Sequence, residues 1–462
     1  MSTLEQDSFF GHRLTRRGLL RLGVGTAGAA MLGGLVGACG TRTSTGGGGA
    51  SATQADAGQV TFLSTQFKPV EEAEKMRKTI LADFKGKVDF TPDDTGPFND
   101  RIQAEAKAGK GNISLVGGQH GDFAPFVSGN LLEDLTPLLD KLKDRNFPQS
   151  IVDLARLGSK DKIYYIPWAQ ATYIMCANKK AQQYLPQGAS LDSITYAQLK
   201  DWGANIQKAT GQRRLGFPGG PNGLLHRFFQ GYLYPSYTKS SGVVEFKSAD
   251  AAQMWTEFKE IWSFCNPQST GYEFMQEPLQ SEEVWVAWDH VARLISAVRD
   301  RPNDFVMFPA PAAGKGRGYM PVIAGLAIPK SAPNRAGAEQ LITYLTEPKQ
   351  QVATLRELSF FPATDAAVPE DLGAGTKLEA DTVKKQQTAK DAVPSLLPVG
   401  LGAKGGEFNK VYRDTFTQIV LNNQPAQQVL DSQAKTLQGI MNDSKAPCWA
   451  PDPPSDGPCT VK

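Results

Sequence analysis

The sequence predicts an α/β fold of two lobes, and two observations support that prediction. Strand-like and helix-like patterns alternate in the order β-α-β-α-β between Val60 and Val116, which is the order of a parallel sheet with helices on its faces. The folded part from Gln59 onward is about 390 residues long, which is too long for one hydrophobic core and suits two lobes.

The first elements follow from apolar runs and helical periodicity. Apolar runs predict strands at 60–64, 88–90, 113–116, 163–166 and 173–176. Between the first two strands, apolar positions at helical spacing predict a helix over 69–84, which ends at Gly86. Asn99 is expected to cap a second helix that runs through Ala108.

The rest of the chain reads as helices with two further buried strands. Thr195 and Gln198 form a capping box for a helix that ends near Gly211, and Ser248 caps another. Strands are expected at 305–308 and 323–328, and helices at 334–346, 348–358, 407–421 and 425–441. The apolar spacing around Trp202, Trp255 and Trp262 assigns all three to the core.

The N-terminal residues have the pattern of a targeting signal. Arg16 and Arg17 precede a weakly apolar run that ends in small residues before Cys39. This pattern predicts a twin-arginine and lipoprotein signal peptide over 1–38, lipidation at Cys39, and a flexible tether over 39–58. Leu19 and Arg21 depart from the usual twin-arginine pattern, so the export route is less secure than export itself.

The remaining cysteines fit an exported protein. Cys448 and Cys459 flank a Pro-rich C-terminal tail over 442–462, which resembles a loop closed by a disulfide outside the cytosol. The alternative is two free thiols on a disordered end. Cys176 and Cys265 read as small buried apolar residues. Because no C-x-x-C pair or His-rich cluster occurs, we expect no metal site.

Charge argues against a nucleic acid partner. Removal of residues 1–38 takes four arginines and two acids from the 49 basic and 47 acidic residues, which leaves 45 of each. A chain without net positive charge or a basic run lacks the field that phosphate backbones require.

Three segments together resemble one family. Residues 163–179 (IYYIPWAQATYIMCANK) are similar to the crossing segment of the extracellular solute-binding proteins of ABC importers, the group of maltose-binding and related sugar-binding proteins. Residues 119–135 resemble that family's turn and helix after the third strand. Residues 305–350 resemble its late block of strand, Gly-rich turn and helix.

The resemblance implies two lobes joined by three crossings, with a hinged cleft. One lobe would take 59–168 plus 312–358, and the other 169–311 plus 359–441. The protein would be a monomer without a cofactor, lipid-anchored to the outer face of the cytoplasmic membrane. It would capture a carbohydrate in the cleft and deliver it to ABC permease subunits in the membrane.

Sugars offer apolar C–H faces and a rim of hydroxyls, which aromatic rings and planar polar groups match. In the segments that would reach the cleft, the candidate ligand contacts are Gln66, Phe67, His120, Asp122, Trp168, Tyr173, Tyr232, Trp288 and Asp289. In particular, we expect Trp168 and Trp288 to sandwich a sugar face from opposite lobes. The chain lacks a Trp near the Gly118–His120 turn, which weakens a maltose-like specificity.

Other solutes and an enzyme remain alternatives. Polyamines need several acids around aromatic rings, whereas a phosphate ester needs an arginine or a helix N-terminus, and Arg317 keeps that option open. A peptide ligand stays open as well. An exported hydrolase has little support, since the sequence contains no G-x-S-x-G, H-E-x-x-H or P-loop motif and we expect no catalytic residue.

Overall fold

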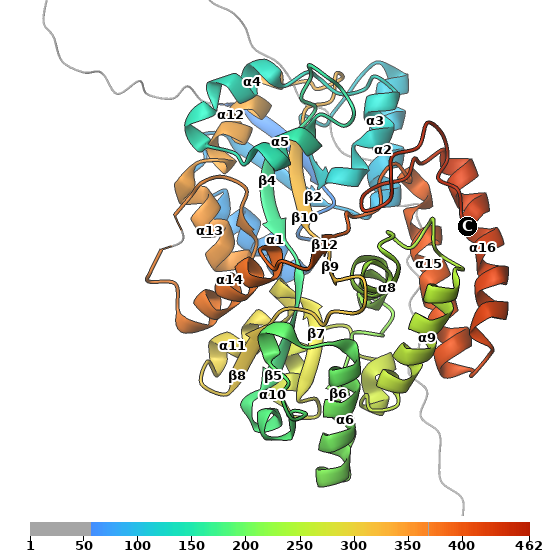
Figure 1. Cartoon of the computed structure of the whole chain (residues 1–462). Helices are drawn as coiled ribbons and strands as arrows, with labels where there is room; N and C mark the ends of the chain where they lie inside the picture. The colour runs from blue at the N-terminus through green and yellow to red at the C-terminus, as the bar shows by residue number, and fades with distance from the viewer. Residues whose placement is uncertain (1–56, 368) are drawn as a thin grey trace, which may run out of the picture. The chain divides into compact units, whose positions relative to one another are not determined.

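The computed structural model describes residues 57–367 and 369–462 (Figure 1). The first lobe is built on a six-stranded sheet in the order β11-β4-β10-β3-β1-β2. Its strands are β1 (Gln59–Ser64), β2 (Lys87–Pro92), β3 (Leu115–Gln119), β4 (Ile166–Ala171), β10 (Val322–Ala327) and β11 (Phe361–Pro362). The first three strands are parallel, as expected, but β10 is antiparallel to both of its neighbours, so the sheet is mixed.

Helices of the first lobe follow the predicted order with shifted ends. They are α1 (Val70–Lys75), which continues as a π-helical turn to Ile80, α2 (Thr95–Ala108), α3 (Ala124–Ser128), α4 (Thr136–Lys141), α5 (Gln149–Ala155), α12 (Arg335–Leu345) and α13 (Pro348–Leu358). Asn99 does not cap α2. Asp94 takes the N-cap position in an extended conformation, and Asn99 lies one turn inside, where its Nδ2 donates to the Thr95 carbonyl at 2.9 Å.

The second lobe has a four-stranded sheet in the order β6-β7-β5-β8. Its strands are β5 (Tyr173–Asn178), β6 (Leu215–Gly216), β7 (Val286–His290) and β8 (Phe305–Phe308). Its helices are α6 (Tyr196–Thr210), α7 (Leu225–Phe228), α8 (Tyr234–Thr238), α9 (Ala249–Trp262), α10 (Gln276–Gln280), α11 (Ile295–Asp300), α14 (Ala374–Gln387), α15 (Gly405–Phe416) and α16 (Ala426–Ser444). A short parallel pair, β9 (Arg317–Tyr319) and β12 (Ala392–Pro394), completes the strands of the described residues.

Local sequence signals are confirmed in this lobe. The Thr195 side chain accepts a hydrogen bond from the Gln198 backbone amide, and the Gln198 side chain accepts one from the Thr195 backbone amide. This is the predicted capping box, and it begins α6. Ser248 caps α9 through the Ala251 amide. Trp202 and Trp255 are fully buried, as expected of core residues, and Trp262 packs partly buried against the same core.

The chain passes between the two large sheets three times. It enters the second lobe between β4 and β5, returns between β8 and β10, and leaves again after β11. The first boundary falls after Ala171 rather than after 168, because β4 continues and Ala171 pairs with Val322. The third falls after Pro362 rather than after 358, because β11 pairs with β4.

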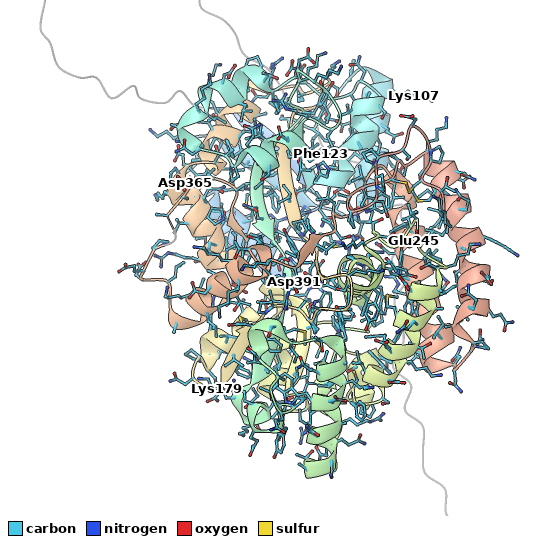
Figure 2. The ribbon with its side chains drawn as sticks, viewed as in Figure 1. Lys107, Phe123, Lys179, Glu245, Asp365 and Asp391 are labelled. Carbon is cyan, nitrogen blue, oxygen red and sulfur yellow. A yellow bond between two sulfur atoms is a disulfide. The ribbon has the colours of Figure 1, made fainter. Side chains whose placement is uncertain are left out.

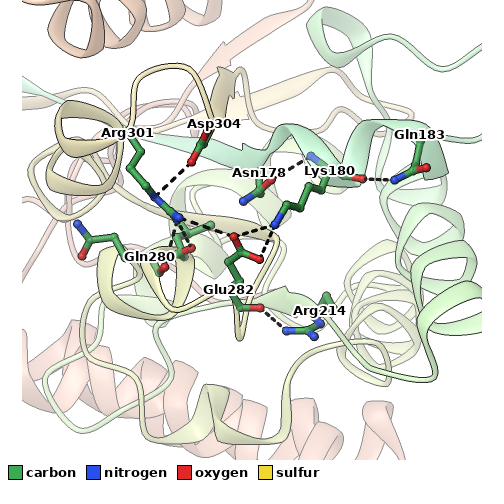
Figure 3. A network of polar contacts seen from close by, with 9 residues as sticks. Asn178, Lys180, Gln183, Arg214, Gln280, Glu282, Arg301 and Asp304 are labelled. Carbon is green, nitrogen blue, oxygen red and sulfur yellow. Dashed lines mark hydrogen bonds and ion pairs between the residues drawn. The ribbon is translucent and has the colours of Figure 1, made fainter.

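An ion-pair network in the second lobe joins the segments around Lys180, Glu282 and Arg301 (Figure 3). The Glu282 carboxylate lies 2.8 Å from Lys180 Nζ at the end of β5 and 3.7 Å from Arg301 Nη1 at the end of α11. Arg301 also pairs with Asp304 at 3.5 Å. Since these side chains are about one-third exposed or more, the network contributes modestly to stability.

The Pro-rich C-terminal segment packs against the second lobe. A disulfide joins Cys448 to Cys459, the pair predicted from the sequence. The Asp452 carboxylate accepts from Ser240 Oγ at 3.1 Å and from the Ser241 amide at 3.0 Å. The C-terminal residue Lys462 donates its amide to the Val244 carbonyl at 2.8 Å. These contacts make residues 446–462 part of the folded lobe.

The predicted signal peptide over 1–38, Cys39 and the tether as far as residue 56 lie outside the described residues. In the part of the chain that the structure describes, no helix has the length and apolar character needed to cross a membrane.

Candidate functional site

A cavity of about 960 Å³ lies between the two lobes. Much of its wall in the first lobe is made where β1, β2 and β3 end, by residues 65–69 and 94–96 and by Gln119, Gly121 and Asp122. Because these strands are parallel, their carboxyl ends meet at one edge of the sheet, where open α/β sheets bind ligands.

The wall in the second lobe comes from the 221–227 loop and helix, the 273–274 segment, the end of β7, and α15. Along α15 and the turn before it, Gly402, Gly405, Gly406, Asn409 and Arg413 line the cavity. Gly402, Gly406, Asn409 and Arg413 are spaced by three to four residues, which places them on one side of the helix, and Gly405 lies next to them. Gly121 from the first lobe fits closely against this side, since a Cβ at Gly121 would lie 1.9 Å from the Pro398 carbonyl oxygen.

Four aromatic side chains line the cavity: Phe67, Tyr173, Phe274 and Phe360. The rings of Phe67 and Phe360 meet edge to face with centroids 4.9 Å apart. Phe67 has φ of +59°, a left-handed conformation that is uncommon for a bulky residue. Backbone strain of this kind concentrates at ligand sites, where the surrounding structure holds it in place.

Hydrogen bonds join the polar groups of the first-lobe wall to one another. The Asp122 carboxylate accepts from Thr65 Oγ1 at 2.9 Å and from the Gln119 amide at 2.9 Å. Gln66 Nε2 donates to Thr65 Oγ1 at 2.9 Å. Burial is the largest influence on Asp122 and raises the pKa of its carboxyl above the ordinary value. This chain of hydrogen bonds fixes the turn after β1 against the turn after β3.

Charged groups also line the cavity. Arg227, Arg293 and Arg413 lie on the second-lobe wall, and burial lowers the pKa of the Arg227 guanidinium from its ordinary value. Glu72 from α1 faces the same space, and burial raises the pKa of its carboxyl to about 7. Among the described residues, no group of His, Cys, Asp and Glu is arranged to hold a metal ion.

The structure brings four of the candidate contacts together on the cavity lining: Gln66, Phe67, Asp122 and Tyr173. The other five, His120, Trp168, Tyr232, Trp288 and Asp289, lie behind the lining.

The two tryptophans do not face each other across the cleft, because each is packed into the core of its own lobe. Trp168 is fully buried, with its ring centroid 5.6 Å from Phe62 and 5.2 Å from Phe67. Trp288 is also fully buried and stacks on Tyr173, with centroids 4.9 Å apart and planes 6° apart. In this structure Trp168 and Trp288 support the lining residues Phe67 and Tyr173 from behind, and the expected sandwich is not formed.

The remaining three residues hold the backbone around the cavity. The Tyr232 hydroxyl donates to the Tyr173 carbonyl at 2.8 Å and accepts from the Tyr173 amide at 3.0 Å, which clamps the start of β5 at a crossing. Asp289 accepts from the His290 and Met275 amides at 2.7 and 3.0 Å. His120 Nδ1 lies 3.0 Å from the Tyr165 hydroxyl, and burial lowers the pKa of its imidazole to about 4. Next to this turn, Phe123 is enclosed in the first lobe and stacks on Tyr165 (Figure 2).

Arg317, the candidate for a phosphate, lies elsewhere. It is buried beside β12, where its guanidinium donates hydrogen bonds to the Ala310 and Asp192 carbonyls. It also forms an ion pair at 3.6 Å with Asp391, which is labelled in Figure 2. The arginines that do reach the cavity, Arg227, Arg293 and Arg413, were not among the candidates. The signals that could have indicated Arg227 and Arg413 are the Gly-rich stretches Gly219–Gly223, which precedes α7, and Gly402–Gly406, which spans the start of α15.

A match to a family model identifies the family of this chain. The model described as bacterial extracellular solute-binding protein matches residues 70–352, which is more than half of the chain. The chain belongs to the bacterial extracellular solute-binding protein family. As a member, this solute-binding protein is exported, and the cavity between its lobes is the candidate place for its solute. No curated protein sequence matches the chain significantly.

Several solved structures share the fold of this solute-binding protein at low sequence identity. The GacH receptor of Streptomyces glaucescens GLA.O, described with acarbose, has a TM-score of 0.64 and 19% identity over 84% of this chain and 99% of its own. Maltose-bound MalE3 of T. maritima has a TM-score of 0.66 and 18% identity over 83% of this chain and 100% of its own. UgpB of Mycobacterium tuberculosis, described in complex with glycerophosphocholine, has a TM-score of 0.62 and 16% identity over 83% of this chain and 98% of its own.

Proposed function

We propose that this protein captures a carbohydrate in the cavity between its lobes and delivers it to the membrane permease of an ABC importer. The observation that carries the proposal is the lining itself, in which aromatic rings and planar polar side chains come from both lobes. Phe67, Tyr173, Phe274 and Phe360 offer faces for the C–H surfaces of sugar rings, while the amides of Gln66, Gln119, Asn222 and Asn409 match hydroxyls. Family membership supports solute capture in general.

A thermal-shift screen of the purified protein against carbohydrates, polyamines and peptides tests this function. A solute that binds only the folded state raises Tm by mass action, by the equivalent of about 2.7 kcal/mol at a hundred times Kd. We expect Tm to rise with members of the carbohydrate set. A rise with polyamines or peptides and with no carbohydrate would exclude the proposed solute class while leaving the family assignment intact.

We further propose that the mature protein is a monomer held at the outer face of the cytoplasmic membrane by lipid on Cys39. The sequence around Cys39 and the export implied by the family support this anchor. Substitution Cys39→Ala is expected to leave an uncleaved precursor or a protein that no longer partitions into detergent, which fractionation and mass spectrometry measure. Arg16→Lys with Arg17→Lys tests the route separately: normal export of that variant would contradict the twin-arginine assignment and leave the lipid anchor untouched.

A further inference from the structure

Three arginines and one histidine lie on the second-lobe wall of the cavity. His226 and Arg227 lie on α7, Arg293 follows β7, and Arg413 lies on α15. We call these four residues the arginine cluster. Burial holds the pKa of the His226 imidazole well below its ordinary value, and the charges of Arg227, Arg413 and Arg293 lower it further. The geometric basis for grouping them is that all four line the same cavity.

Within the described residues, the three arginines form no ion pair with a carboxylate, and the hydrogen-bond partners of Arg227 and Arg293 are neutral. Among the ion pairs formed within 4.0 Å in the described part of the chain, none includes Arg227, Arg293 or Arg413. Arg227 Nη1 donates to Gln230 Oε1 at 3.0 Å. Arg293 Nη1 donates to the carbonyls of Asn222 and Glu273 at 3.2 and 3.1 Å, and its guanidinium lies 4.4 Å from the centre of the Phe274 ring. The positive charge of the cluster is therefore not neutralised by contact with a carboxylate.

Three of the four carboxyl groups that line the cavity have hydrogen-bond or ion-pair donors of their own. Asp94 pairs with Lys68, and Asp122 accepts from Thr65 and Gln119 as described above. Glu273 Oε1 accepts from Asn222 Nδ2 at 2.9 Å. Two of these acids moderate the cluster: the charge of Arg293 opposes the rise in the pKa of Glu72, and the charge of Arg227 opposes the rise in the pKa of Asp122. Arg413 acts on Arg227 as a like charge: burial is the main cause that lowers the pKa of the Arg227 guanidinium, and the charge of Arg413 lowers it further, whereas Tyr173 and Asp122 oppose this effect.

A second observation indicates that a ligand binds next to the arginine cluster. His226 is buried and lines the cavity, yet its Nδ1 has no hydrogen-bond partner among the described residues. A buried polar atom without a partner costs about 1–3 kcal/mol, so such atoms point to a missing ligand or water. The adjoining face of α15 also leaves room, because a Cβ at Gly405 or Gly406 would meet no atom within 4 Å.

We propose that the captured carbohydrate is acidic, and that Arg227 and Arg413 bind its phosphate or carboxylate group while His226 and Arg293 complete the site. This inference rests on the proposed function, since it names the class of carbohydrate for the same cavity. Guanidinium groups bind carboxylate and phosphate through paired, charge-assisted hydrogen bonds. An anion also removes the repulsion between Arg227 and Arg413, and its oxygen would accept from His226 Nδ1 when that nitrogen carries the proton.

Calorimetry on the purified protein tests the inference with neutral oligosaccharides and their uronate-containing and phosphorylated counterparts. We expect the tightest binder to be acidic. Arg413→Gln is expected to weaken that binding at least tenfold, which corresponds to about 1.4 kcal/mol, and to change binding of a neutral sugar by less than about threefold. Asn409→Asp keeps the acceptor for Gln230 Nε2 and adds a negative charge on the same face of α15, so it should weaken acidic ligands in the same way.

Two controls separate binding from folding. Arg335→Gln removes an arginine that pairs with Glu133 and Glu339 on the first lobe, outside the cavity lining, and should leave affinity unchanged. Inorganic phosphate should raise the Tm of the wild-type protein and not that of Arg413→Gln. Without ligand, Arg413→Gln should melt no earlier than wild type, because it relieves repulsion; a purely structural Arg413 would give a lower Tm.

The outcomes distinguish this inference from the proposed function. A neutral sugar that binds tightest, with equal affinity for Arg413→Gln, would overturn the anionic site and leave carbohydrate capture standing. Arginine-dependent binding of glycerol phosphodiesters, with no sugar bound, would support the anionic site and overturn carbohydrate as the solute class. Binding of no carbohydrate and no anion would overturn both.

Discussion

At the scale of single residues, the position of a side chain along a buried strand decides whether it lines the cavity or packs behind the residues that line it. All five residues of β7 are buried, so the alternation that normally separates a core face from an open face is absent. His290 reaches the cavity lining, whereas Trp288, two residues earlier on the same face, lies beneath Tyr173. The sequence indicates an aromatic residue near the cleft, but not which one is exposed to it.

Trp288→Ala is expected to lower the free energy of unfolding by about 3–5 kcal/mol, since it removes a fully buried indole and leaves a cavity. Any loss of affinity should follow from the freed Tyr173 ring rather than from a lost ligand contact. Denaturant unfolding with calorimetry on the folded fraction measures both. A variant of normal stability that fails to bind would place Trp288 in the binding surface after all.

Asp289 makes stability depend on pH. Its carboxyl ionises near pH 3.8 in the unfolded chain, whereas burial raises its pKa to about 7 in the folded protein. Between these values the folded state keeps a proton that the unfolded state has released. The contribution of Asp289 to the free energy of unfolding is therefore fully present below about pH 4, falls as pH rises to about 7, and is constant above that.

The Asp289→Asn variant lacks this titration. We therefore expect wild type to lose stability relative to Asp289→Asn as pH rises from 4 to 7, by ~1.4 kcal/mol for each unit by which the two pKa values differ. Urea unfolding of both proteins at several pH values measures the difference, in which other acids such as Glu72 cancel. A difference that stays constant with pH would mean that Asp289 is ionised in the folded state throughout this range.

At the scale of elements, the sequence is most informative where a rule of backbone geometry applies. Gln66, Phe67 and Asp122 could be predicted because the turns after parallel strands must converge. Arg227 and Arg413 could not, since they lie on helices whose orientation depends on packing between distant parts of the chain. In the same way, the capping box of α6 is local and predictable, while the start of α2 is set by Asp94 and its surroundings.

The C-terminal segment shows how a short element is held without regular structure. Its disulfide closes a loop with a sequence separation of 11, and its removal by Cys448→Ser with Cys459→Ser should lower the free energy of unfolding by about 2–3 kcal/mol. Thermal melting with and without reductant measures this loss. If reductant lowers the Tm of the double variant as much as that of wild type, another reducible group is responsible.

At the scale of the whole molecule, the cavity has walls on two lobes that the chain joins at three crossings. We expect ligand to close the lobes by a hinge motion about these crossings, since a ligand that contacts both walls binds the closed form more tightly. Small-angle scattering should then show a lower radius of gyration with ligand. An unchanged radius at saturation would mean that the protein binds its solute without closing.

The position of β10 has a consequence for how the protein is made. This strand lies between β3 and β4 in the sheet. Along the chain, however, more than half of the second lobe's sequence separates it from β4. A growing chain therefore completes the second lobe's sheet, from β5 to β8, before the strand that unites the first lobe's sheet exists. Until Val322–Ala327 emerges, β3 and β4 have unpaired edges, which are the surfaces through which β-proteins aggregate. Assembly of the first lobe is thus expected to be the late and slow step of folding, and the stage at which a nascent chain most needs protection.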